Sequence, residues 1–468
     1  MDTKKLRQKI LDLAIHGKLV PQDPNDEPAS VLLERIKAEK ERLIKEGKIK
    51  RSKKPAKTSS DTPHYQQDVP YEVPSNWGWT TLGEIFTLQA GKNITAKDIS
   101  AKQDKDHCYP CYGGNGLRGY VSNYNKEGHF PLIGRQGALC GNVNEANGKF
   151  YATEHAVVVD TYCKTNIPWV INTLLYLNLN QYATSTAQPG LSVSTINDVM
   201  IPVPPLEEQQ KISQIIKKWF SLIDQLEQGK SDLQTVIKQT KSKILGLAIH
   251  GKLVPQDPND EPASELLKRI HPKAEITCDN GHYPQLPKGW TNVTIKDICE
   301  NINGLWKGKK EPFVNVGVIR NANFTKDFKL DYSNIEYIDV EQRAFVQRHL
   351  LNGDLIVEKS GGSDNNPVGR AVLYEGGSGV FSYSNFTMVL RIKYKELVLS
   401  KFLYYYILAK YKAGVMKSMQ TQTTGLHNLI LDKYLAMPLY LPPYSEQERI
   451  INKIEDMFEK LDAIMESL

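Results

Sequence analysis

Residues 13–30 read LAIHGKLVPQDPNDEPAS, and residues 247–264 read the same letters in the same order. A second match lies further along each half, where residues 203–209 read VPPLEEQ and residues 441–447 read LPPYSEQ. Self-similarity of this kind is the sequence signature of a repeated structural unit. The chain of 468 residues is therefore predicted to contain two copies of one scaffold.

A third pair of matches marks where each copy opens a longer insert. Residues 74–77 read PSNW and lead to LGEI, whereas residues 287–290 read PKGW and lead to IKDI. Between these openings and the proline pairs lie two long segments, 73–202 and 286–438, that do not resemble each other. A shared scaffold with divergent inserts is the arrangement that two readers of different targets would need.

A heptad seam predicts one long helix between the inserts. Its apolar positions in 4-3 spacing are Ile212, Ile216, Trp219, Ile223, Leu226, Leu233, Ile237, Ile244 and Leu247. This spacing predicts a coiled-coil helix of about 45 residues, roughly 65–70 Å long. Pro204 and Pro205 suit the start of such a helix, and Gly251 suits its stop.

The two chain ends repeat the two halves of that seam. The C-terminal segment repeats the first half with Ile450, Ile454, Met457, Leu461, Ile464 and Leu468. The N-terminal segment repeats the second half with Leu6, Ile10 and Leu13. The simplest geometry lays both ends antiparallel against the central helix, because this buries their apolar stripes. We therefore expect an α+β protein in which two mixed α/β domains are separated by a long antiparallel helical coiled coil, as a pseudo-two-fold repeat.

The predicted domain organisation follows from these markers. In chain order the segments are an N-terminal helical scaffold segment (1–50), a linker (51–72), a first variable domain (73–202), a central coiled-coil helix (203–250), a repeat turn and linker (251–285), a second variable domain (286–438) and a C-terminal coiled-coil helix (439–468). Within the variable domains, 156–159 and 386–392 are predicted strands, and 168–179 and 400–412 are predicted helices. The repeated turn, VPQDPND at 20–26 and again at 254–260, either caps a helix or makes identical contacts with two copies of one partner.

Composition limits the class of protein. The formal net charge of +6 is mildly basic and favours a nucleic-acid partner only slightly. The seven Lys or Arg residues between Lys45 and Lys57 fit a solvated linker or a nucleic-acid contact. Since there is no run of eighteen apolar residues, no membrane partner is expected. The N-terminus lacks a signal peptide and the six cysteines lack a disulfide-framework spacing, so we expect a cytoplasmic protein.

Both variable segments contain loops rich in Gly, Asn, Tyr and Arg, which are candidate DNA-reading loops. Glycine allows close approach of the backbone, arginine pairs with guanine, and asparagine or glutamine pairs with adenine. The candidates in the first segment are Lys92, Asn115, Arg118, Tyr120, Arg135, Gln136 and Gln188. The candidates in the second segment are Lys307, Lys309, Lys310, Lys359, Asn365, Asn366, Arg370, Tyr383 and Asn385. Each of these residue types is also common in ordinary loops.

Two further segments are expected to correspond between the halves. Residues 188–191 read QPGL and residues 423–426 read TTGL. Each precedes a possible short helix, whose N-terminal amides could hold a phosphate.

Several short strings match enzyme motifs, but each lacks a residue or a flanking element that the motif requires. The string GNGLRG at 114–119 fits the dinucleotide fingerprint but lacks the flanking strand, helix and acidic partner. The string LPPY at 441–444 lacks the Asn or Asp that an amino-methyltransferase loop requires. Asp354 with Glu358 and Lys359 is poorly spaced for a nuclease, and Cys108 with Cys111 has no second pair for zinc. We therefore predict no catalytic residue, no metal site and no cofactor of the chain's own.

The order of these parts resembles the specificity subunits of type I restriction-modification systems. The Pro-Pro-x-x-Glu-Gln helix openings and the Pro-x-x-Trp domain openings are similar to that family's repeated regions. The loops 112–120 and 133–138, and the loops 358–363 and 367–370, resemble its two target-recognition domains. The resemblance covers nearly the whole chain.

The resemblance implies a function that the residues alone do not give. Each variable domain would read one half of a split site in double-stranded DNA, and the coiled coil would hold the two domains at a fixed separation. Two methyltransferase subunits would dock on the helices, and restriction and translocation subunits would join them. S-adenosylmethionine, ATP and magnesium would then belong to those partners.

Two other function classes remain to be separated from this one. A pure scaffold would keep the coiled coil but would not need two unlike inserts, and neutralising Arg135 and Arg370 separately would distinguish it from a DNA reader. A related two-part system, with a fused nuclease-methyltransferase partner, would use a similar subunit.

Overall fold

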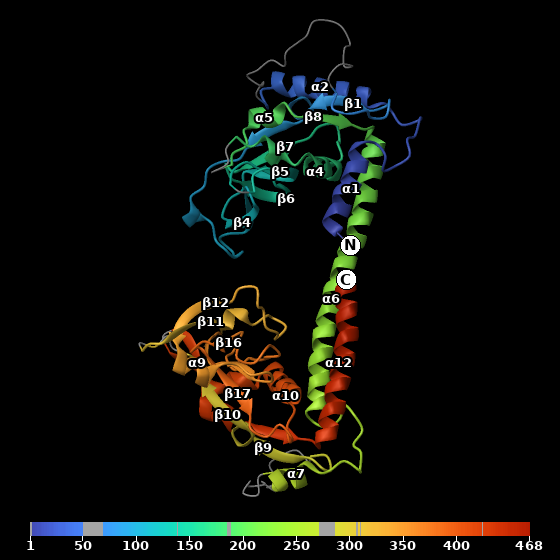
Figure 1. Cartoon of the computed structure of the whole chain (residues 1–468). Coiled ribbons are helices and arrows are strands. Elements are labelled where there is room, and N and C mark those ends of the chain that lie inside the picture. The colour runs from blue at the N-terminus through green and yellow to red at the C-terminus, as the bar shows by residue number, and fades with distance from the viewer. Residues whose placement is uncertain are drawn as a thin grey trace. The chain divides into compact units, whose positions relative to one another are not determined.

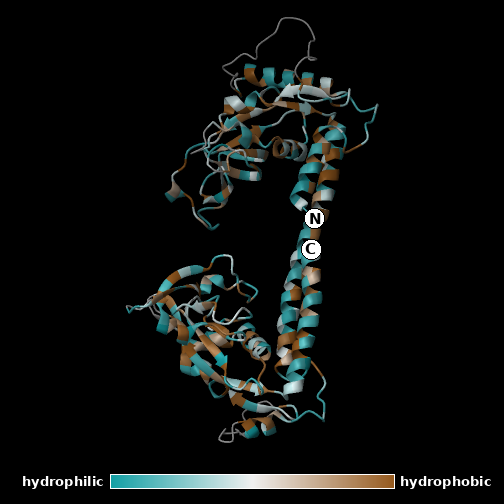
Figure 2. Cartoon of the chain, in the orientation of Figure 1, coloured by the Kyte–Doolittle hydropathy of each residue, from teal (hydrophilic) through white to brown (hydrophobic). Residues whose placement is uncertain are grey.

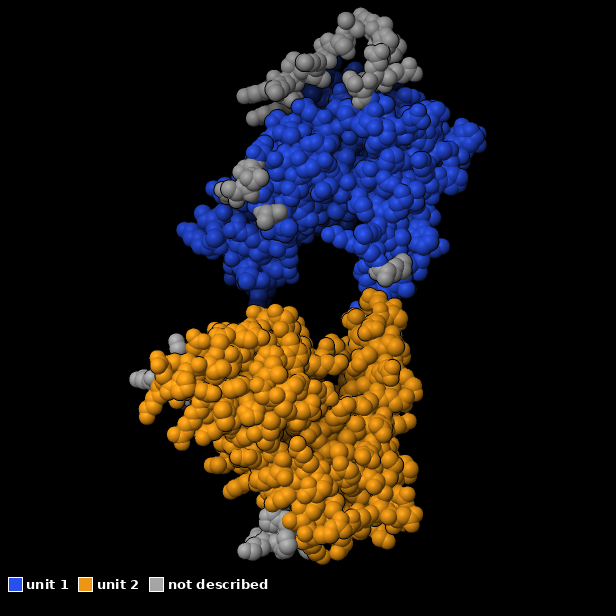
Figure 3. All heavy atoms as spheres, viewed as in Figure 1, with its two compact units in different colours: residues 1–229 blue, residues 230–468 orange. Residues whose placement is uncertain are grey.

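The computed structural model describes residues 2–49, 69–137, 139–184, 189–270, 286–305, 308, 310–423 and 425–468 (Figure 1). The chain divides into two compact units, residues 1–229 and 230–468, drawn as blue and orange spheres in Figure 3. Residues 51–68 of the first predicted linker and 271–285 of the second lie outside the described residues. Both units contain helices and sheets, which confirms the predicted α+β class.

Unit 1 is built on a six-stranded sheet of order β2-β7-β5-β6-β3-β4. Its elements are α1 (Thr3–Ile15), α2 (Ala29–Lys45), β1 (Gly78–Thr81), α3 (Leu82–Ile85), β2 (Thr87–Ala90), η1 (Ala96–Asp98), β3 (Tyr109–Gly113), β4 (Gly116–Val121), β5 (Lys126–Gly134), β6 (Val143–Ala152), β7 (Ala156–Asp160), α4 (Ile167–Leu177), η2 (Leu179–Tyr182), α5 (Val193–Asn197), β8 (Met200–Val203) and the start of α6 (Leu206–Ala248). A separate pairing of β1 with β8 joins the two ends of the variable segment.

Unit 2 divides the same kind of sheet into smaller ones. Its elements after α6 are α7 (Ala263–Ile270), β9 (Thr291–Thr294), α8 (Ile295–Ile298), β10 (Cys299–Asn303), β11 (Phe313–Ile319), η3 (Asn321–Asn323), β12 (Glu336–Glu341), α9 (Gln342–Arg348), β13 (Leu355–Glu358), β14 (Ser360–Gly362), β15 (Ala371–Leu373), β16 (Phe381–Tyr383), β17 (Thr387–Ile392), α10 (Ser400–Lys412), η4 (Val415–Met419), β18 (Gln420–Thr423), β19 (Leu426–Leu429), α11 (Leu431–Leu435), β20 (Pro438–Leu441) and α12 (Tyr444–Ser467).

The strand orders of the two units correspond. The sheet β10-β17-β13-β15 repeats the order β2-β7-β5-β6 of unit 1, and β20 pairs with β9 as β8 pairs with β1. The parallel pairing of β11 with β16 repeats that of β3 with β6. The predicted strands at 156–159 and 386–392 are confirmed as β7 and β17, and the predicted helices at 168–179 and 400–412 as α4 and α10.

Some of the predicted seam residues bury one helix against α6 in each unit, whereas Trp219, Leu226 and Leu233 of the predicted seam are exposed. In unit 1, Ile10 of α1 lies in one buried cluster with Ile212 and Ile216 of α6. In unit 2, Ile450 and Ile454 of α12 lie in one buried cluster with the far end of α6. Along these helices hydrophobic residues, brown in Figure 2, alternate with hydrophilic ones, teal. Each contact therefore buries one face and leaves the other exposed, as expected for an amphipathic helix.

The direction of each pairing is antiparallel. Near its N-terminus α1 places Arg7 Nη2 at 2.6 Å from Asp224 Oδ1, whereas the turn after α1 places Asp26 Oδ2 at 3.0 Å from Lys211 Nζ. In unit 2 the Lys241 ammonium pairs with Asp462, close to the C-terminal end of α12. Both chain ends thus run against the direction of α6.

A buried carboxylate joins the repeated turn to the start of α6 in unit 1 and to the start of α12 in unit 2. Glu208, at the start of α6, accepts from Trp77 Nε1 at 2.9 Å and from Gln22 Nε2 at 2.6 Å. Burial raises the pKa of Glu208, and both donors oppose that rise. We call Gln22, Trp77 and Glu208, with their second copy Gln256, Trp290 and Glu446, the carboxylate nodes. The nodes show that the turn has a structural role in each unit.

Candidate nucleic-acid interface

Unit 1 gathers several predicted DNA-reading loops at one edge of its sheet. After β5 ends, the Arg135 amide donates to the His155 carbonyl at 3.0 Å, and the Leu191 amide donates to the Arg135 carbonyl at 2.8 Å. After β2 ends, the Lys92 amide donates to the Ala152 carbonyl at 3.0 Å. These three backbone bonds hold the ends of β2, β5 and β6 at the turn that leads into β7.

Two close backbone approaches require glycine at this edge. A Cβ atom on Gly134 would lie 2.0 Å from the Gly114 carbonyl oxygen, and one on Gly91 would lie 2.1 Å from the Ala152 oxygen. Neither position has room for a side chain unless the backbone shifts. The glycine-rich loop 112–120 therefore packs directly on loop 133–138, as two segments of one surface.

Unit 2 repeats these backbone bonds with different residues. The Lys359 amide donates to the Phe386 carbonyl at 2.8 Å, and the Leu429 amide donates to the Lys359 carbonyl at 2.8 Å. The Leu305 amide donates to the Tyr383 carbonyl at 2.9 Å. We call these three bonds, together with the three bonds described for unit 1, the recognition framework. These bonds show which residues of the two variable domains occupy equivalent positions, although their sequences do not resemble each other.

The framework corrects one expected correspondence. Segments 188–191 and 423–426 were expected to match, which would pair Leu191 with Leu426. The framework instead pairs Leu191 with Leu429, because both amides donate to the equivalent carbonyls. Leu426 begins strand β19 and lies three residues before Leu429, so the shared Gly-Leu dipeptides do not occupy equivalent positions. The short helices α5 and α11 do follow these segments.

The predicted candidates of unit 1 lie largely on this surface. Lys92, Asn115, Arg118 and Gln136 are exposed, and Tyr120 and Arg135 are half-buried. A Cβ atom on Gly113 would lie 3.7 Å from the Arg118 side chain and 3.8 Å from that of Thr153, so the hairpin that carries Arg118 borders the framework. Gln188 lies outside the described residues.

The predicted candidates of unit 2 are divided between the framework and other loops. Lys359 and Asn385 lie at the framework and are half-buried. The Lys359 ammonium donates to Asn303 Oδ1 at 3.0 Å, and burial lowers its pKa. Lys310, Asn365 and Asn366 are exposed on loops. Lys307 and Lys309 lie outside the described residues.

Two candidates of unit 2 are placed differently from expectation. Tyr383 is 0% exposed and belongs to a buried cluster with Ile319 and Phe324, so it is a core residue rather than a surface contact. Arg370 is held internally, because its Nε donates to Glu358 Oε2 at 3.2 Å and its guanidinium lies 5.2 Å from the Phe324 ring. The letters Pro-Val-Gly-Arg alone could not reveal that acidic partner twelve residues earlier.

Sequence reasoning missed the turns that lead into β7 and β17. Glu154 and His155 stand at the framework in unit 1, with His155 Nε2 at 3.2 Å from Glu154 Oε1. Phe386 stands at the equivalent place in unit 2 and is 47% exposed. The available signal was an exposed aromatic or charged residue just before a continuous apolar strand, where the chain leaves the sheet edge.

Polar atoms without partners collect around the framework in both units. Buried polar groups in folded proteins are normally hydrogen-bonded. Among the described residues, atoms of this kind without a hydrogen-bond partner include Arg135 Nε, Glu154 Oε2 and His155 Nδ1 in unit 1, and Asn321 Oδ1, Tyr383 OH and Ser384 Oγ in unit 2. The interior beneath each edge is thus polar and incompletely satisfied.

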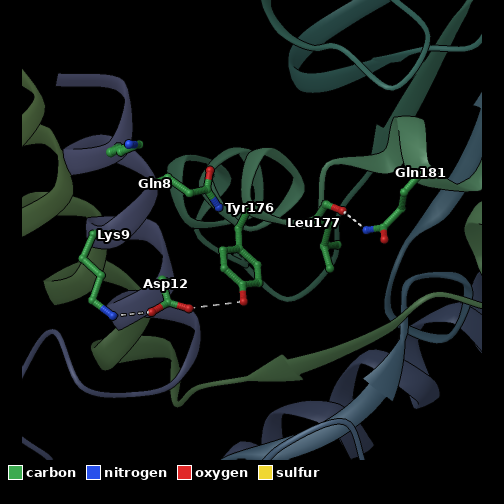
Figure 4. Close-up of a pocket in the computed structure, with 7 residues that line it drawn as sticks. Gln8, Lys9, Asp12, Tyr176, Leu177 and Gln181 are labelled. Carbon is green, nitrogen blue, oxygen red and sulfur yellow. Dashed lines mark hydrogen bonds and ion pairs between the residues drawn. The ribbon is translucent and has the colours of Figure 1, made fainter. Parts of the chain in front are cut away.

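One further hollow of unit 1 has its charges paired internally. A hollow of about 450 Å³ lies between α1 and α4, where Lys9 Nζ donates to Asp12 Oδ2 at 2.9 Å (Figure 4). Tyr176 also points at Asp12, so the charges of this hollow are already paired internally. The described ranges contain no group of three His, Cys, Asp or Glu residues placed to hold a metal ion. No helix in these ranges is long and apolar enough to cross a membrane.

The chain matches the family model for the type I restriction modification DNA specificity domain twice, over residues 74–234 and 287–468. It is similar to the type I restriction enzyme EcoEI specificity subunit of Escherichia coli, at 28% identity over 99% of this chain and 90% of that protein. It is also similar to the EcoprrI specificity subunit of Escherichia coli, at 47% identity over 31% of this chain and 36% of that protein.

One solved structure has a comparable fold. It belongs to work on complex assembly and conformational transition of the type I R-M system, and it matches with a TM-score of 0.55 and 16% identity. The match covers 85% of this chain and 94% of that one.

Proposed function

Because the chain belongs to the family that carries the type I restriction modification DNA specificity domain, we propose that it is the non-catalytic DNA-reading subunit of a type I restriction-modification complex. Each variable domain reads one half of a split, asymmetric site in double-stranded DNA. The observation that carries this proposal is the recognition framework, since the same backbone bonds in two units present different side chains. Two unlike readers in one chain specify two unlike half-sites.

The helices act as the spacer between the two readers. We propose that α6, with α1 and α12, forms an antiparallel coiled coil and that the chain is a pseudo-two-fold repeat. Support comes from the antiparallel ion pairs, the duplicated carboxylate nodes and the buried seam residues Ile212, Ile216, Ile223, Ile237 and Ile244. A helical spacer of fixed length sets a fixed number of base pairs between half-sites, as in other two-module readers.

The exposed face of α6 supports docking of two methyltransferase subunits. On the unit 1 part of α6, the exposed apolar residues are Trp219, Leu222 and Leu226, spaced three and four apart. On the unit 2 part they are Leu233 and Val236. Apolar residues at helical spacing on an exposed face are typical of a surface that receives another helix. The identical repeated turns give two copies of one partner the same neighbouring contacts.

The chemistry of the complex belongs to the partners. A methyltransferase subunit supplies the S-adenosylmethionine site, and restriction and translocation subunits supply the ATP and magnesium sites. Such a complex acts on the chromosome, so we place the chain in the cytoplasm. A related two-part system would use the same reader with a fused nuclease-methyltransferase partner.

Base-methylation mapping tests the proposal. Cells would express this chain alone, the methyltransferase of the neighbouring gene alone, or both. A split asymmetric motif that is methylated only when both are present is the expected result. Methylation by this chain alone would contradict its non-catalytic role, and a motif unchanged by the presence of this chain would contradict its role in recognition.

A further inference from the structure

The recognition framework equates individual side chains of the two readers. Because Arg135 and Lys359 donate through their amides to the carbonyls of His155 and Phe386, these residues form two equivalent pairs. Glu154 precedes His155 and Asn385 precedes Phe386, so Glu154 and Asn385 are equivalent as well. Each unit therefore presents one cation, one polar residue and one ring at the same place: Arg135, Glu154 and His155, or Lys359, Asn385 and Phe386.

The set in unit 1 combines a donor fork with an acceptor. The half-buried Arg135 side chain has no hydrogen bond to another described residue, and its Nε is buried without a partner. Among the described residues Glu154 contacts the neighbouring His155 through Oε1, its side chain is 34% exposed, and its buried Oε2 has no partner. Arginine donates to O6 and N7 of guanine, whereas a carboxylate accepts from the N4 amine of cytosine. The two side chains together complement the two bases of a G·C pair.

The set in unit 2 has the opposite character. Its cation is already engaged, since Lys359 Nζ donates to Asn303 Oδ1 at 3.0 Å. The Asn385 amide makes no side-chain hydrogen bond within the described ranges, and the Phe386 ring beside it is 47% exposed. Asparagine bonds bidentately to adenine, and phenylalanine makes apolar contact with the thymine methyl group. The side chains together complement an A·T pair.

We infer that the turns before β7 and β17 are the equivalent base-reading turns of the two domains, an inference that rests on the proposed function. Arg135 and Glu154 read a G·C pair in one half-site. Asn385 and Phe386 read an A·T pair at the corresponding position of the other half-site. The difference in specificity between the domains thus resides partly in a two-residue exchange on a common backbone.

Reciprocal exchange of these residues tests the inference in the full chain. One variant carries E154N and H155F, and the other carries N385E and F386H. Each would be expressed with the methyltransferase of the neighbouring gene, and methylated motifs would be mapped across the genome. We expect each exchange to change preference by roughly 10-fold to 100-fold at one base pair of one half-site only. The untouched half-site serves as the internal control for folding and assembly.

Single substitutions cover the case in which an exchanged pair does not fold. Glu154→Ala should relax discrimination at a G·C position, and Phe386→Ala should relax it at an A·T position. Val346→Ala removes another exposed apolar side chain of unit 2, 61% exposed on α9, and should leave the motif unchanged. A full level of methylation with an unaltered motif in both exchange variants and in both single variants at the turns would overturn the inference and leave the proposed function standing.

Two further results would also count against it. Changes in both half-sites from one variant, or a change at a base pair of the other class, would overturn the assignment. A wild-type chain that directs no split motif would overturn the proposed function itself.

Discussion

A buried carboxylate with two donors joins parts of the chain that are far apart in sequence. Glu208 is 1% exposed and receives one hydrogen bond from Trp77, at the opening of the variable domain, and one from Gln22 in the repeated turn. A carboxylate that loses a donor in a buried site is left partly unsatisfied, which costs about 1–3 kcal/mol. The second copy at Glu446, 0% exposed, should respond in the same way.

Gln22→Ala should therefore lower the free energy of unfolding by about 1–3 kcal/mol at neutral pH. Gln22 lowers the pKa of Glu208, so its removal raises that pKa further above the unfolded value of 4.5. The folded state then holds a proton that the unfolded state releases, and stability falls as pH rises from 4.5 through the raised pKa. Denaturant unfolding at pH 4 and pH 7.5 should show the larger loss at pH 7.5.

Matched variants make this prediction specific. Gln256→Ala alters the second carboxylate node and should give a similar loss with the same pH dependence. Lys18→Ala changes an exposed residue two positions before the same turn and should alter the unfolding free energy by less than about 0.5 kcal/mol. Equal losses from Lys18→Ala and Gln22→Ala would refute the role of the node.

Sequence reasoning at the residue scale found loops better than it found side chains. Arg135 and Gln136 were predicted because guanidinium and amide groups pair with bases, and they do stand at the sheet edge. Tyr383 carries the same kind of signal but is buried, because the strand alternation that turns it inward depends on the pairing of β16 with β11. Pairing between strands that are far apart in the chain cannot be predicted from the residues around Tyr383 alone.

At the scale of elements, α6 contains glycines that its conformation does not require. A Cβ atom on Gly229 or Gly246 would meet nothing within 4 Å, and both lie inside the helix. Glycine costs about 0.5–1 kcal/mol relative to alanine in a helix interior. Gly229→Ala and Gly246→Ala should each raise the unfolding free energy by about that amount, as measured by thermal or denaturant unfolding.

A glycine-to-alanine substitution just past the end of α6 should lower the unfolding free energy instead of raising it. Gly251 has φ +66°, and a Cβ atom there would lie 2.3 Å from Pro287 Cγ. Gly251→Ala should therefore destabilise the chain by at least about 1 kcal/mol. A destabilising Gly246→Ala or a neutral Gly251→Ala would contradict a helix that continues through Gly246 and ends at Ala248.

The exposed apolar residues of α6 lead to a prediction about assembly. Leu226 is 56% exposed, so Leu226→Glu should change the stability of the chain by less than about 0.5 kcal/mol. It should nevertheless weaken co-purification of the methyltransferase, because a charge would be buried in the docking contact. Ile223→Ala is the matched control for a buried position of the same helix. Ile223 is 1% exposed, so this substitution should destabilise the chain itself by about 2–5 kcal/mol. Undiminished co-purification of the Leu226→Glu variant would place the docking surface elsewhere.

Helices were more predictable from sequence than sheets. The start of α6 at Leu206 follows two prolines, and its seam repeats over many heptads, so both local and periodic signals agree. The sheets have no such redundancy. The six-stranded order of unit 1 and its division in unit 2 depend on insertions between strands, such as the α9 region, whose pairing no local pattern determines.

At the scale of the whole molecule, the duplication explains both what is shared and what differs. The recognition framework recurs in both units with nearly the same distances, and the carboxylate nodes recur with tryptophan bonds of 2.9 and 3.0 Å and glutamine bonds of 2.6 and 3.1 Å. The side chains at the framework do not recur. Backbone bonds therefore hold the loops in both units, while the side chains on those loops differ. Under the proposed function, the two half-sites could then diverge without a change in the scaffold.

The proposed spacer role of α6 leads to a prediction about its length. Seven extra residues keep a heptad seam in register and lengthen a helix by about 10 Å. This length corresponds to about three base pairs of DNA at roughly 3.4 Å each. The two readers themselves are untouched by such an insertion.

The most direct test of the central claim is therefore methylation mapping of a chain with one heptad inserted after Gly229. We expect both half-sites to keep their sequences while the spacer between them grows by about three base pairs. An insertion of equal length after the exposed Gly377 should leave the spacer unchanged. An unaltered spacer in the Gly229 insertion, or a change in the half-site sequences, would contradict the account of two independent readers on a helical ruler.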